Sequence, residues 1–401
     1  MTFELLRPCP VCANKLGTIL HHQVFIVPAE LQAVSKVDVV SCDHCGACFS
    51  DLPTPQEDLD DTYRDHSKYA DTTLYSEEET DRPPTDAPWD LERLAGTAAW
   101  LAEHAPLDAR VLDAGCATGA LLGFLKAEGF ADLVGLDPSP LATRTASRTY
   151  GVPTVTGSFF NPPNDIGLFD VVVLSHVLEH LTDVRGAIDG MWQLTRPGGQ
   201  VYIEVPDASR YADHLVAPFH DFNTEHINHF SRHTLQLAME LAGFETIHMD
   251  TKDVMCSPAD AYPALFGLFR RIDSPGEPPA LVRDDDLPAA IVRYVARSEE
   301  LMANLTQHIR TQLGDRPMIV WGAGQLAMKL LAELRDNEIV ALVDTSESKW
   351  GLEFGDQIVV GPIAIADNDD PILITSIHHQ ASIENSIRAL LPRREFVTLR
   401  S

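Results

Sequence analysis

The sequence has no long apolar run and few basic residues, and both absences exclude classes of protein. No apolar stretch of the 401-residue chain approaches the roughly 20 residues that a membrane-spanning helix requires. Only 30 lysine and arginine residues stand against 59 aspartate and glutamate residues, which gives a formal net charge of -29. Such a chain repels nucleic-acid backbones and anionic membranes. We therefore expect neither a nucleic acid nor a membrane as its partner.

Cysteine is also scarce, and its distribution is uneven. The chain has 7 cysteines, and all but two of them lie before residue 50. The N-terminal stretch MTFELLRPCPVC lacks the hydrophobic region of a signal peptide, so we expect a cytoplasmic protein. In a reducing compartment, a cysteine cluster is more typical of a metal site than of a disulfide framework. The apolar content of 45% is sufficient for folded cores.

Two CxxC pairs, Cys9/Cys12 and Cys42/Cys45, predict a structural zinc site. Each pair places two thiolates on a tight turn, and four thiolates satisfy a tetrahedral Zn²⁺ ion. This ligand set leaves no position for water, so we expect the zinc to stabilise a small fold rather than to catalyse. Cys48 is a fifth candidate that could replace one of the four ligands. Buried free cysteines and a redox CxxC pair are the alternative interpretations.

The chain reads as four consecutive parts. Residues 1–75 hold the cysteine pairs and an acidic, proline-rich cover segment, and residues 76–272 alternate strand-like and helix-like segments. Residues 273–315 combine a linker with a long amphipathic helix, and residues 316–401 form a second, smaller α/β unit. Strands that alternate with helices predict a parallel sheet covered on both faces. The predicted fold class is therefore α/β.

The segment VLDAGCATGALLGFL has the character of a nucleotide-binding turn. Asp113, Gly115 and Gly119 lie between a predicted strand and a predicted helix, where glycines permit a sharp turn and a close ligand. Asp137 ends the next predicted strand, where a carboxylate can accept both ribose hydroxyls of an adenosine cofactor. The turn lacks the middle glycine of a dinucleotide site and begins with an acid. These features suit a cationic amino-acid cofactor better than a diphosphate.

Four segments in order over residues 110–205 resemble a class I S-adenosylmethionine (SAM)-dependent methyltransferase. They are DAGCATG, the acid of VGLDPS, FDVVVLSHVLEHL and RPGGQVYIEVP. The resemblance implies a Rossmann-like core that binds SAM through Asp113, Gly115, Cys116, Gly119, Asp137, Pro138, Ser158, Phe159, Ser175 and His176. Ser158 and Phe159 stand where the family usually has an acid against adenine. Ser175 and His176 are expected to face the reactive end of the cofactor.

The segment HVLEH within the third of these stretches has a second possible reading. It matches the H-x-x-E-H pattern of inverted zinc peptidases. That chemistry requires the pattern within a helix and a third ligand downstream, whereas here the pattern crosses the end of a predicted strand. We therefore favour the methyltransferase interpretation.

The order of parts along the chain is similar to that of the three-domain sugar C-methyltransferases, which methylate nucleotide-linked keto-deoxysugars. In this family a Glu-His pair before FS lies at the active site, and here the pair is Glu225–His226 in EHINHFS. The resemblance implies that His226, with a pKa near ambient pH, removes a proton alpha to a ketone, and that the enolate attacks the SAM methyl group. A neighbouring carboxylate can orient the ring. The alternatives are that His226 hydrogen-bonds the substrate, or that the pair is structural.

Further residues are candidates for the acceptor side of the site. His180 is a candidate catalytic residue, with a structural role as the alternative. Candidate substrate-binding residues are Asn223, Tyr63, Tyr69 and His378. Asn223 stands where the family often has a tyrosine, which removes a phenol from the site. The two tyrosines, with Tyr75, could close over the substrate as a lid or anchor the cover segment to the core.

The C-terminal part resembles a mononucleotide-binding half without a bound dinucleotide. The turn Gly322-Ala-Gly324 lacks the third glycine of such sites, so we expect no tight pyrophosphate binding. We expect this part to wall the substrate cleft, with docking or dimerisation as the alternative, in a monomer or a homodimer. Two rival functions stay open. One is an O- or N-methyltransferase acting on a sugar or another small natural-product metabolite, and the other is a non-catalytic SAM-binding scaffold.

Overall fold

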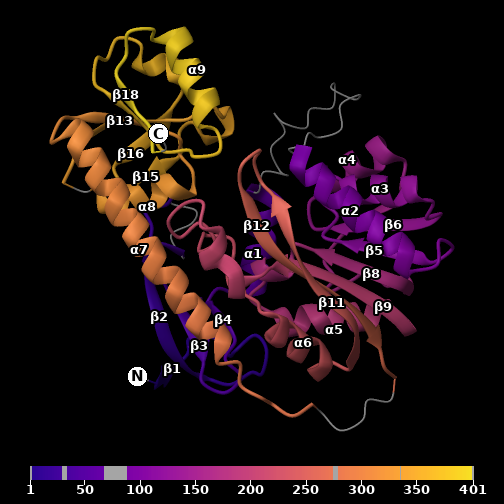
Figure 1. Ribbon diagram of the computed structural model, residues 1–401. Helices are drawn as coiled ribbons and strands as arrows, with labels where there is room; N and C mark the ends of the chain where they lie inside the picture. The colour runs from indigo at the N-terminus through magenta and orange to yellow at the C-terminus, as the bar shows by residue number, and fades with distance from the viewer. Residues whose placement is uncertain (1, 29–33, 67–87, 274–278, 335, 400–401) are drawn as a thin grey trace. The chain divides into compact units, whose positions relative to one another are not determined.

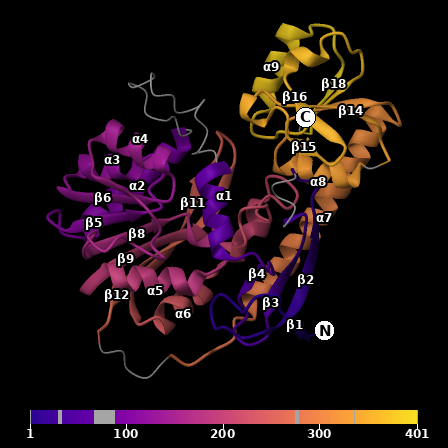
Figure 2. The same cartoon turned by 180° about the vertical axis from the view of Figure 1, so that it is seen from behind.

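The computed structural model describes residues 2–28, 34–66, 88–273, 279–334 and 336–399 (Figures 1 and 2). The chain divides into two compact units. Unit 1 comprises Met1–Thr18, Val40–His214 and Glu225–Ala290, and unit 2 comprises Ile19–Val39, Leu215–Thr224 and Ile291–Ser401. Over the described ranges, none of the helices combines the length and the hydropathy that crossing a bilayer requires.

A seven-stranded sheet forms the centre of unit 1. Its strands, in spatial order, are β11 (Phe244–Met255), β12 (Ala261–Arg271), β9 (Thr195–Pro206), β8 (Phe169–Ser175), β5 (Arg110–Ala114), β6 (Asp132–Asp137) and β7 (Thr154–Thr156). Neighbouring strands from β7 to β9 are parallel, as the alternating pattern predicts. β12 pairs antiparallel with both β9 and β11. The sequence analysis did not predict this hairpin at the edge of the sheet.

Helices cover both faces of this sheet (Figure 1). One face carries α2 (Pro88–His104), α3 (Ala120–Glu128) and α4 (Pro140–Tyr150), and the other carries α5 (Val184–Leu194) and α6 (Arg232–Leu241). Several begin at side-chain caps, since Ser139 caps α4, Asp183 caps α5 and Ser231 forms a capping box in α6. Because both faces are covered, the central strand β8 is almost continuously apolar and buried.

The N-terminal cysteine segment belongs to a second sheet. Its strands, in order, are β1 (Thr2–Glu4), β2 (Leu16–Val24), β3 (Lys36–Cys42), β4 (Cys48–Ser50) and β10 (Asn228–His229), and helix α1 (Gln56–His66) follows β4 in the chain. The last strand comes from a distant part of the sequence. It pairs antiparallel with β4, with His229 opposite Cys48 and Asn228 opposite Phe49. A segment of the predicted active site is therefore a strand of the cysteine module's sheet.

Unit 2 contains a third, smaller sheet. Its order is β15 (Glu353–Phe354), β16 (Gln357–Val360), β14 (Ile339–Val343), β13 (Met318–Trp321), β17 (Ile372–Ile374) and β18 (Phe396–Val397). The pairs are parallel except that of β15 with β16. It contains helices α8 (Gln325–Glu333) and α9 (Gln380–Leu390). Helix α7 (Asp286–Leu313) begins in unit 1 and continues into unit 2 from Ile291. The predicted second α/β unit thus has its own parallel sheet and core.

Candidate active site

The turn between β5 and α3 has the backbone that its glycines permit. Gly115 has φ +80° and Gly119 has φ +84°, both in the left-handed region. A Cβ atom at Gly119 would lie 2.6 Å from the Cβ of Ala146, and one at Gly115 would lie 2.6 Å from Cγ2 of Val177. Both positions therefore require glycine for conformation and for space.

Two buried carboxylates face this turn. Asp137, at the end of β6, accepts hydrogen bonds from the amides of Ala117 (2.9 Å) and Ser139 (2.8 Å), one on each oxygen. Each oxygen retains a lone pair that a ribose hydroxyl can use. Burial raises the pKa of Asp137 to about 6. Burial and the charge of Asp137 raise the pKa of Asp113 to about 7, against the opposing charge of Arg93. A cationic ligand would favour the charged form of both acids.

The other predicted cofactor residues follow the carboxyl ends of adjacent parallel strands. Cys116 is buried in the turn after β5, and Pro138 is half-buried after β6. Ser158 and the buried Phe159 follow β7, and the hydroxyl of Ser158 accepts a hydrogen bond from the backbone amide of Phe160 at 3.3 Å. Ser175 ends β8. The structure therefore brings these positions to one edge of the sheet, where ligands of open α/β sheets bind.

His176 is held in a strained and fully bonded position. Its φ is +54°, which is uncommon for a residue with a side chain. Its Nδ1 lies 3.0 Å from Oε1 of Glu179, and its Nε2 lies 3.2 Å from Oε1 of Glu204 and 3.3 Å from the hydroxyl of Tyr262. Burial lowers the pKa of His176, but the hydrogen bonds to both glutamates raise it overall. The ring is thus part of an ion-pair network at the end of β8.

Glu204 is the centre of this network, and none of the sequence motifs singled it out. Its second oxygen accepts bonds from Lys252 (2.8 Å), Tyr202 (2.8 Å) and Thr97 (3.1 Å), and its side chain is fully buried. Burial opposes ionisation, yet the bond to His176 and the charge of Lys252 hold the pKa of Glu204 well below its usual range. One signal was present in the sequence. An acid within the apolar strand segment VYIEVP needs a buried partner.

A second cluster lies directly after β8 and contains two of the predicted catalytic residues. Glu179 and His180 belong to a short helical turn, Leu178–His180, and His226 precedes β10. One ligand atom from each of the three side chains lies within 4.8 Å of the others. The rings of His180 and His226 are 4.9 Å apart at 72°. Two imidazoles and a carboxylate therefore converge beside the edge that carries Ser175.

The predicted pairing of Glu225 with His226 takes a different form in the structure. Glu225 is exposed, and it is its backbone carbonyl that contacts Nδ1 of His180, at 3.0 Å. The acid whose charge acts on His226 is Glu179. Burial and the charge of His180 hold the pKa of His226 well below its usual range, whereas the sequence analysis expected a value near ambient pH. The imidazole is thus neutral and carries one lone pair.

Asn228 and Arg7 explain why these distant segments meet. The amide of Asn228 donates to the carbonyl oxygens of Leu181 (2.7 Å) and Leu178 (3.1 Å). Its oxygen accepts from the buried guanidinium of Arg7 at 3.0 Å, and the same guanidinium donates to Ile227 at 3.3 Å. The turn that carries Glu179 and the strand that follows His226 are therefore fixed to each other and to the N-terminal module.

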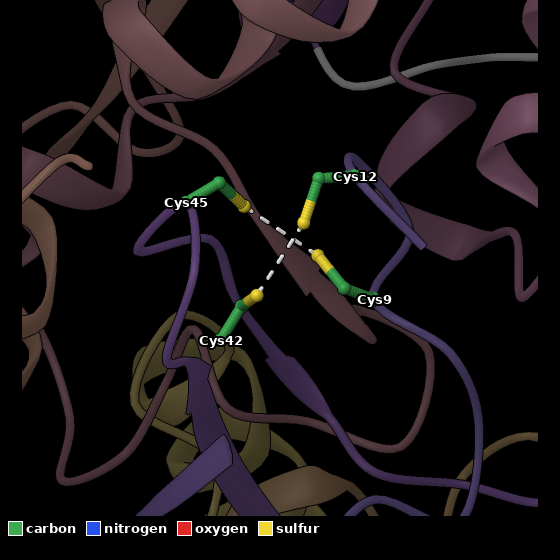
Figure 3. A group of neighbouring side chains, drawn as sticks. All are labelled: Cys9, Cys12, Cys42 and Cys45. Atoms are coloured by element: carbon green, nitrogen blue, oxygen red, sulfur yellow. Dashed lines mark hydrogen bonds between the residues drawn. The ribbon is translucent and has the colours of Figure 1, made fainter. Parts of the chain in front are cut away.

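Figure 3 shows the four predicted zinc ligands with their sulfur atoms turned toward one another. The Sγ atoms of Cys9 and Cys45 are 3.6 Å apart, and those of Cys12 and Cys42 are 3.5 Å apart. Zinc–sulfur bonds of about 2.3 Å in a tetrahedron place sulfurs about 3.8 Å apart, so the four thiols fit this ion. Cys48 lies outside the group, and its thiol donates to the carbonyl of Gly46 at 3.5 Å.

The remaining substrate-binding candidates do not belong to this cluster. Asn223 and His378 lie in unit 2, where the rings of His378 and His220 are 5.7 Å apart and the amide of Asn223 donates to His220 at 3.4 Å. Tyr63 is a residue of helix α1. Tyr69 and Tyr75 lie outside the described residues.

The glycine turn of unit 2 repeats the arrangement seen at Asp137. Asp344, after β14, accepts from the amides of Ala323 and Ser346, each at 2.9 Å. The difference is Lys349, whose ammonium group lies 2.9 Å from the same carboxylate. Lys349 therefore uses part of the hydrogen-bonding capacity of Asp344. The expectation from the sequence, that this turn does not bind a pyrophosphate tightly, stays a prediction.

Comparison with known proteins gives two family matches. A family model described as a methyltransferase domain matches residues 89–249, and one described as C2185-like, N-terminal, matches residues 314–393. The chain is 31% identical over 125 residues to a cypemycin N-terminal methyltransferase from Streptomyces sp, covering 29% of this chain and 50% of that protein. It is 32% identical over 114 residues to a ubiquinone biosynthesis O-methyltransferase from Erwinia tasmaniensis, covering 26% and 45%. The chain spans about half the length of these relatives or less.

Solved structures that resemble the chain include methyltransferases. A magnesium protoporphyrin IX methyltransferase from Synechocystis PCC 6803 with bound SAM has a TM-score of 0.39 and 16% identity, covering 54% of this chain and 96% of that chain. A SAM-dependent methyltransferase from Methanosarcina mazei has a TM-score of 0.38 and 14% identity, covering 43% and 97%. The strand order and the family match confirm the predicted α/β fold with a Rossmann-like class I methyltransferase core, and residues 89–249 match a methyltransferase domain.

Proposed function

We propose that the whole chain is a SAM-dependent methyltransferase of small molecules, and that its acceptor is a nucleotide-linked keto-deoxysugar methylated on carbon. The domain match over residues 89–249 supports the methyl transfer. The order of a cysteine module, a methyltransferase core, the EHINHFS segment and a second α/β unit supports the sugar acceptor. Within this proposal the chain has four parts, residues 1–75, 76–272, 273–315 and 316–401. The protein is cytoplasmic, and the four cysteines of its CxxC pairs bind a zinc ion.

The single observation that carries the methyl-donor site is the pair of buried acids. Asp137 has its carboxylate fixed by two backbone amides, and Asp113 is 3% exposed with a raised pKa. SAM carries an ammonium and a sulfonium group that would neutralise this buried charge, and its ribose would use the remaining lone pairs of Asp137. The bound cofactor supplies an electrophilic methyl group. The chain's own task is to orient it and to activate the acceptor.

Activation of the acceptor is assigned to the cluster that contains His226. An α-carbon is nucleophilic only after it loses a proton, and a positioned group of this kind contributes roughly 10²–10⁴-fold. The lone pair of the neutral imidazole is the activating group, and Glu179 and His180 position it. Alignment of the acceptor against the donor supplies much of the remaining rate. Asn223, His378 and the tyrosines at 63 and 69 remain candidates for binding the sugar nucleotide.

Two measurements test this proposal. Calorimetry with SAM tests the donor site, and we expect Asp113→Asn to bind SAM far more weakly than wild type. A mass screen across nucleotide ketosugars, with exchange of the α-hydrogen in deuterated water, tests the acceptor. We expect a 14-dalton gain and His226-dependent exchange. Methyl transfer without any α-hydrogen exchange would exclude carbon methylation.

The second candidate function is O-methylation of a small metabolite. The relatives from Erwinia tasmaniensis and Methylocella silvestris are named ubiquinone biosynthesis O-methyltransferases, the latter at 34% identity over 102 residues with 23% of this chain and 38% of that protein covered. In this case the same cluster acts on a hydroxyl group. A product whose new methyl group is lost on ether cleavage distinguishes it from carbon methylation.

A further inference from the structure

We propose that Glu179, His180 and His226 bind a divalent transition-metal ion beside the methyl-donor site. The three side chains come from two segments that are distant in the sequence, and the structure places one ligand atom of each within 4.8 Å of the others. This site is separate from the four cysteines. It uses residues of the methyltransferase domain itself.

The buried carboxylate of Glu179 has one oxygen that a cation would satisfy. Its side chain is 1% exposed, and its Oε1 is bonded to His176 at 3.0 Å. Its other oxygen, Oε2, has no hydrogen-bond partner among the residues that the structure describes. Leaving a buried carboxylate oxygen unbonded is costly, typically by about 1–3 kcal/mol or more for a charged group. A cation bound at this oxygen removes that cost.

One ring nitrogen of His180 already makes a hydrogen bond, and this bond fixes which nitrogen can bind a metal. Its Nδ1 faces the backbone carbonyl of Glu225 at 3.0 Å, and a carbonyl can only accept, so Nδ1 carries the hydrogen. The lone pair is then on Nε2, which lies 3.9 Å from Oε1 of Glu179. Histidines that ligate metals almost always donate their other N–H group to a carbonyl or a carboxylate in this way.

The surroundings of the cluster also have the organisation of a metal site. The bond from His176 fixes the orientation of Glu179, and Glu204 in turn fixes His176 at 3.2 Å. Ligating carboxylates are commonly held by such outer hydrogen bonds. The side chain of His180 is 17% exposed, so solvent and a substrate can reach this face of the cluster.

The ligand set indicates the class of ion. Two imidazoles and one carboxylate suit Mn²⁺, Fe²⁺, Co²⁺ or Zn²⁺, whereas Mg²⁺ and Ca²⁺ prefer sites made only of oxygen. Three protein ligands leave coordination positions open, as in catalytic rather than structural sites. Ligands of one ion are about 3–4 Å apart, so a small contraction of the cluster completes the site.

This inference rests on the proposed function for its catalytic consequence. The lone pair of His226 then binds the ion, and the ion replaces the imidazole as the activating group. The oxygen of the acceptor occupies one open position, and the ion stabilises the negative charge that develops on it. A hydroxide on another open position takes the proton and becomes water. The resulting carbon or oxygen nucleophile bonds to the methyl carbon, and the carbon–sulfur bond breaks with its electron pair on sulfur.

Titration of the zinc-loaded protein with Mn²⁺, followed by the paramagnetic resonance signal of free Mn²⁺, tests the site without any methyl acceptor. Excess Mg²⁺ is included to saturate weak sites on the acidic surface. We expect one Mn²⁺ per chain that Mg²⁺ does not displace. Glu179→Gln and His226→Ala are expected to lose it, and His176→Gln to weaken it about 10–100-fold. His104→Gln, which alters an exposed histidine of α2, is the matched control and keeps it.

Each outcome is informative about the site. Calorimetric binding of SAM by the variants shows that they are folded. If wild type binds no Mg²⁺-resistant Mn²⁺, or if Glu179→Gln binds as wild type does, the inference is wrong. Methyl transfer that persists at full rate after chelation of this site would refute the catalytic role while leaving the proposed function intact. Metal binding without methyl transfer to any acceptor would refute the proposed function and leave the metal site intact.

Discussion

The side-chain amide of Asn228 donates a 2.7 Å hydrogen bond to the backbone carbonyl of Leu181. The bond joins the strand that follows His226 to the turn that follows β8, so it fixes the distance between the two halves of the Glu179–His180–His226 cluster. It also makes the cluster depend on β4, because β10 is a strand only by pairing with β4.

Replacing Asn228 by alanine is expected to separate these two segments. The change removes the hydrogen bonds of Asn228 to the carbonyls of Leu181 and Leu178 and to the Arg7 guanidinium, so the free energy of unfolding should fall by about 1–3 kcal/mol. We expect methyl transfer to fall by at least tenfold, while the affinity for SAM changes less than twofold. Denaturant unfolding and calorimetry measure these quantities. Asn164→Ala, at an exposed position, is the control and should change neither.

The affinity for SAM is expected to depend on pH through Asp113. Its pKa of about 7 in the free protein lies above the ordinary value of 3.8, and a bound cation lowers it. Binding therefore releases a proton, and the affinity should rise about tenfold between pH 5.5 and 7. By the same linkage, the free protein loses stability as the pH rises from about 4 to 7, because its folded form holds the proton longer.

Calorimetry in buffers of different ionisation enthalpy measures the released proton directly. Asp113→Asn removes one of the two titrating acids, so its residual SAM affinity should rise less over this range than that of the wild type, through Asp137 alone. Equal pH dependence in the variant and the wild type would assign the effect to another group.

Glu204 is expected to stabilise the domain because its buried carboxylate is the shared partner of several half-buried cations. Glu204→Gln leaves His176, Lys252 and Arg93 without their common charge partner, which should cost about 3–5 kcal/mol of folding free energy. Glu245→Gln, which removes an exposed ion pair with Arg270, should cost about 0–1 kcal/mol. Urea unfolding of both variants measures the difference. Equal effects would show that the buried network contributes no more than a surface pair.

If the four cysteines bind zinc as proposed, removal of the ion is expected to affect the segment that carries His226 more than the proposed donor site. Cys12→Ser should lose the ion, whereas Cys48→Ser should retain it, because the thiol of Cys48 is bonded to Gly46 and lies outside the group of four. In the zinc-free protein, the backbone amides of β4 and β10 should exchange hydrogen faster, while those of β5 and β6 keep their protection. Metal analysis and hydrogen-exchange mass spectrometry measure both effects. Loss of zinc in Cys48→Ser would contradict the assignment of ligands.

The sequence predicted the parts of the fold that local patterns determine. Buried parallel strands such as β8 are short apolar runs, and the turn at Gly115 and Gly119 has a backbone that few other residues tolerate. The hairpin of β11 and β12 was missed because β11 is an edge strand whose residues are largely exposed and polar. Local hydropathy does not distinguish such a strand from a loop.

The candidate site was predictable only in part for a related reason. Asp113 stands beside the glycine turn, and Asp137 stands at the end of a predicted strand, so a local pattern marks each of them. The contact of Glu179 with His226 depends on the pairing of β10 with β4, which no local pattern indicates. The resemblance to the sugar C-methyltransferases implied Glu225 as the partner of His226.

The position of β10 limits how this protein can be divided. A methyltransferase core expressed without the first 50 residues would retain the donor turn and its acids, but β10 would have no strand beside it. On the proposed function, such a fragment would bind SAM and leave the acceptor unactivated. Exchange of the N-terminal module would meet the same obstacle, so the cysteine module and the core must be expressed as one piece.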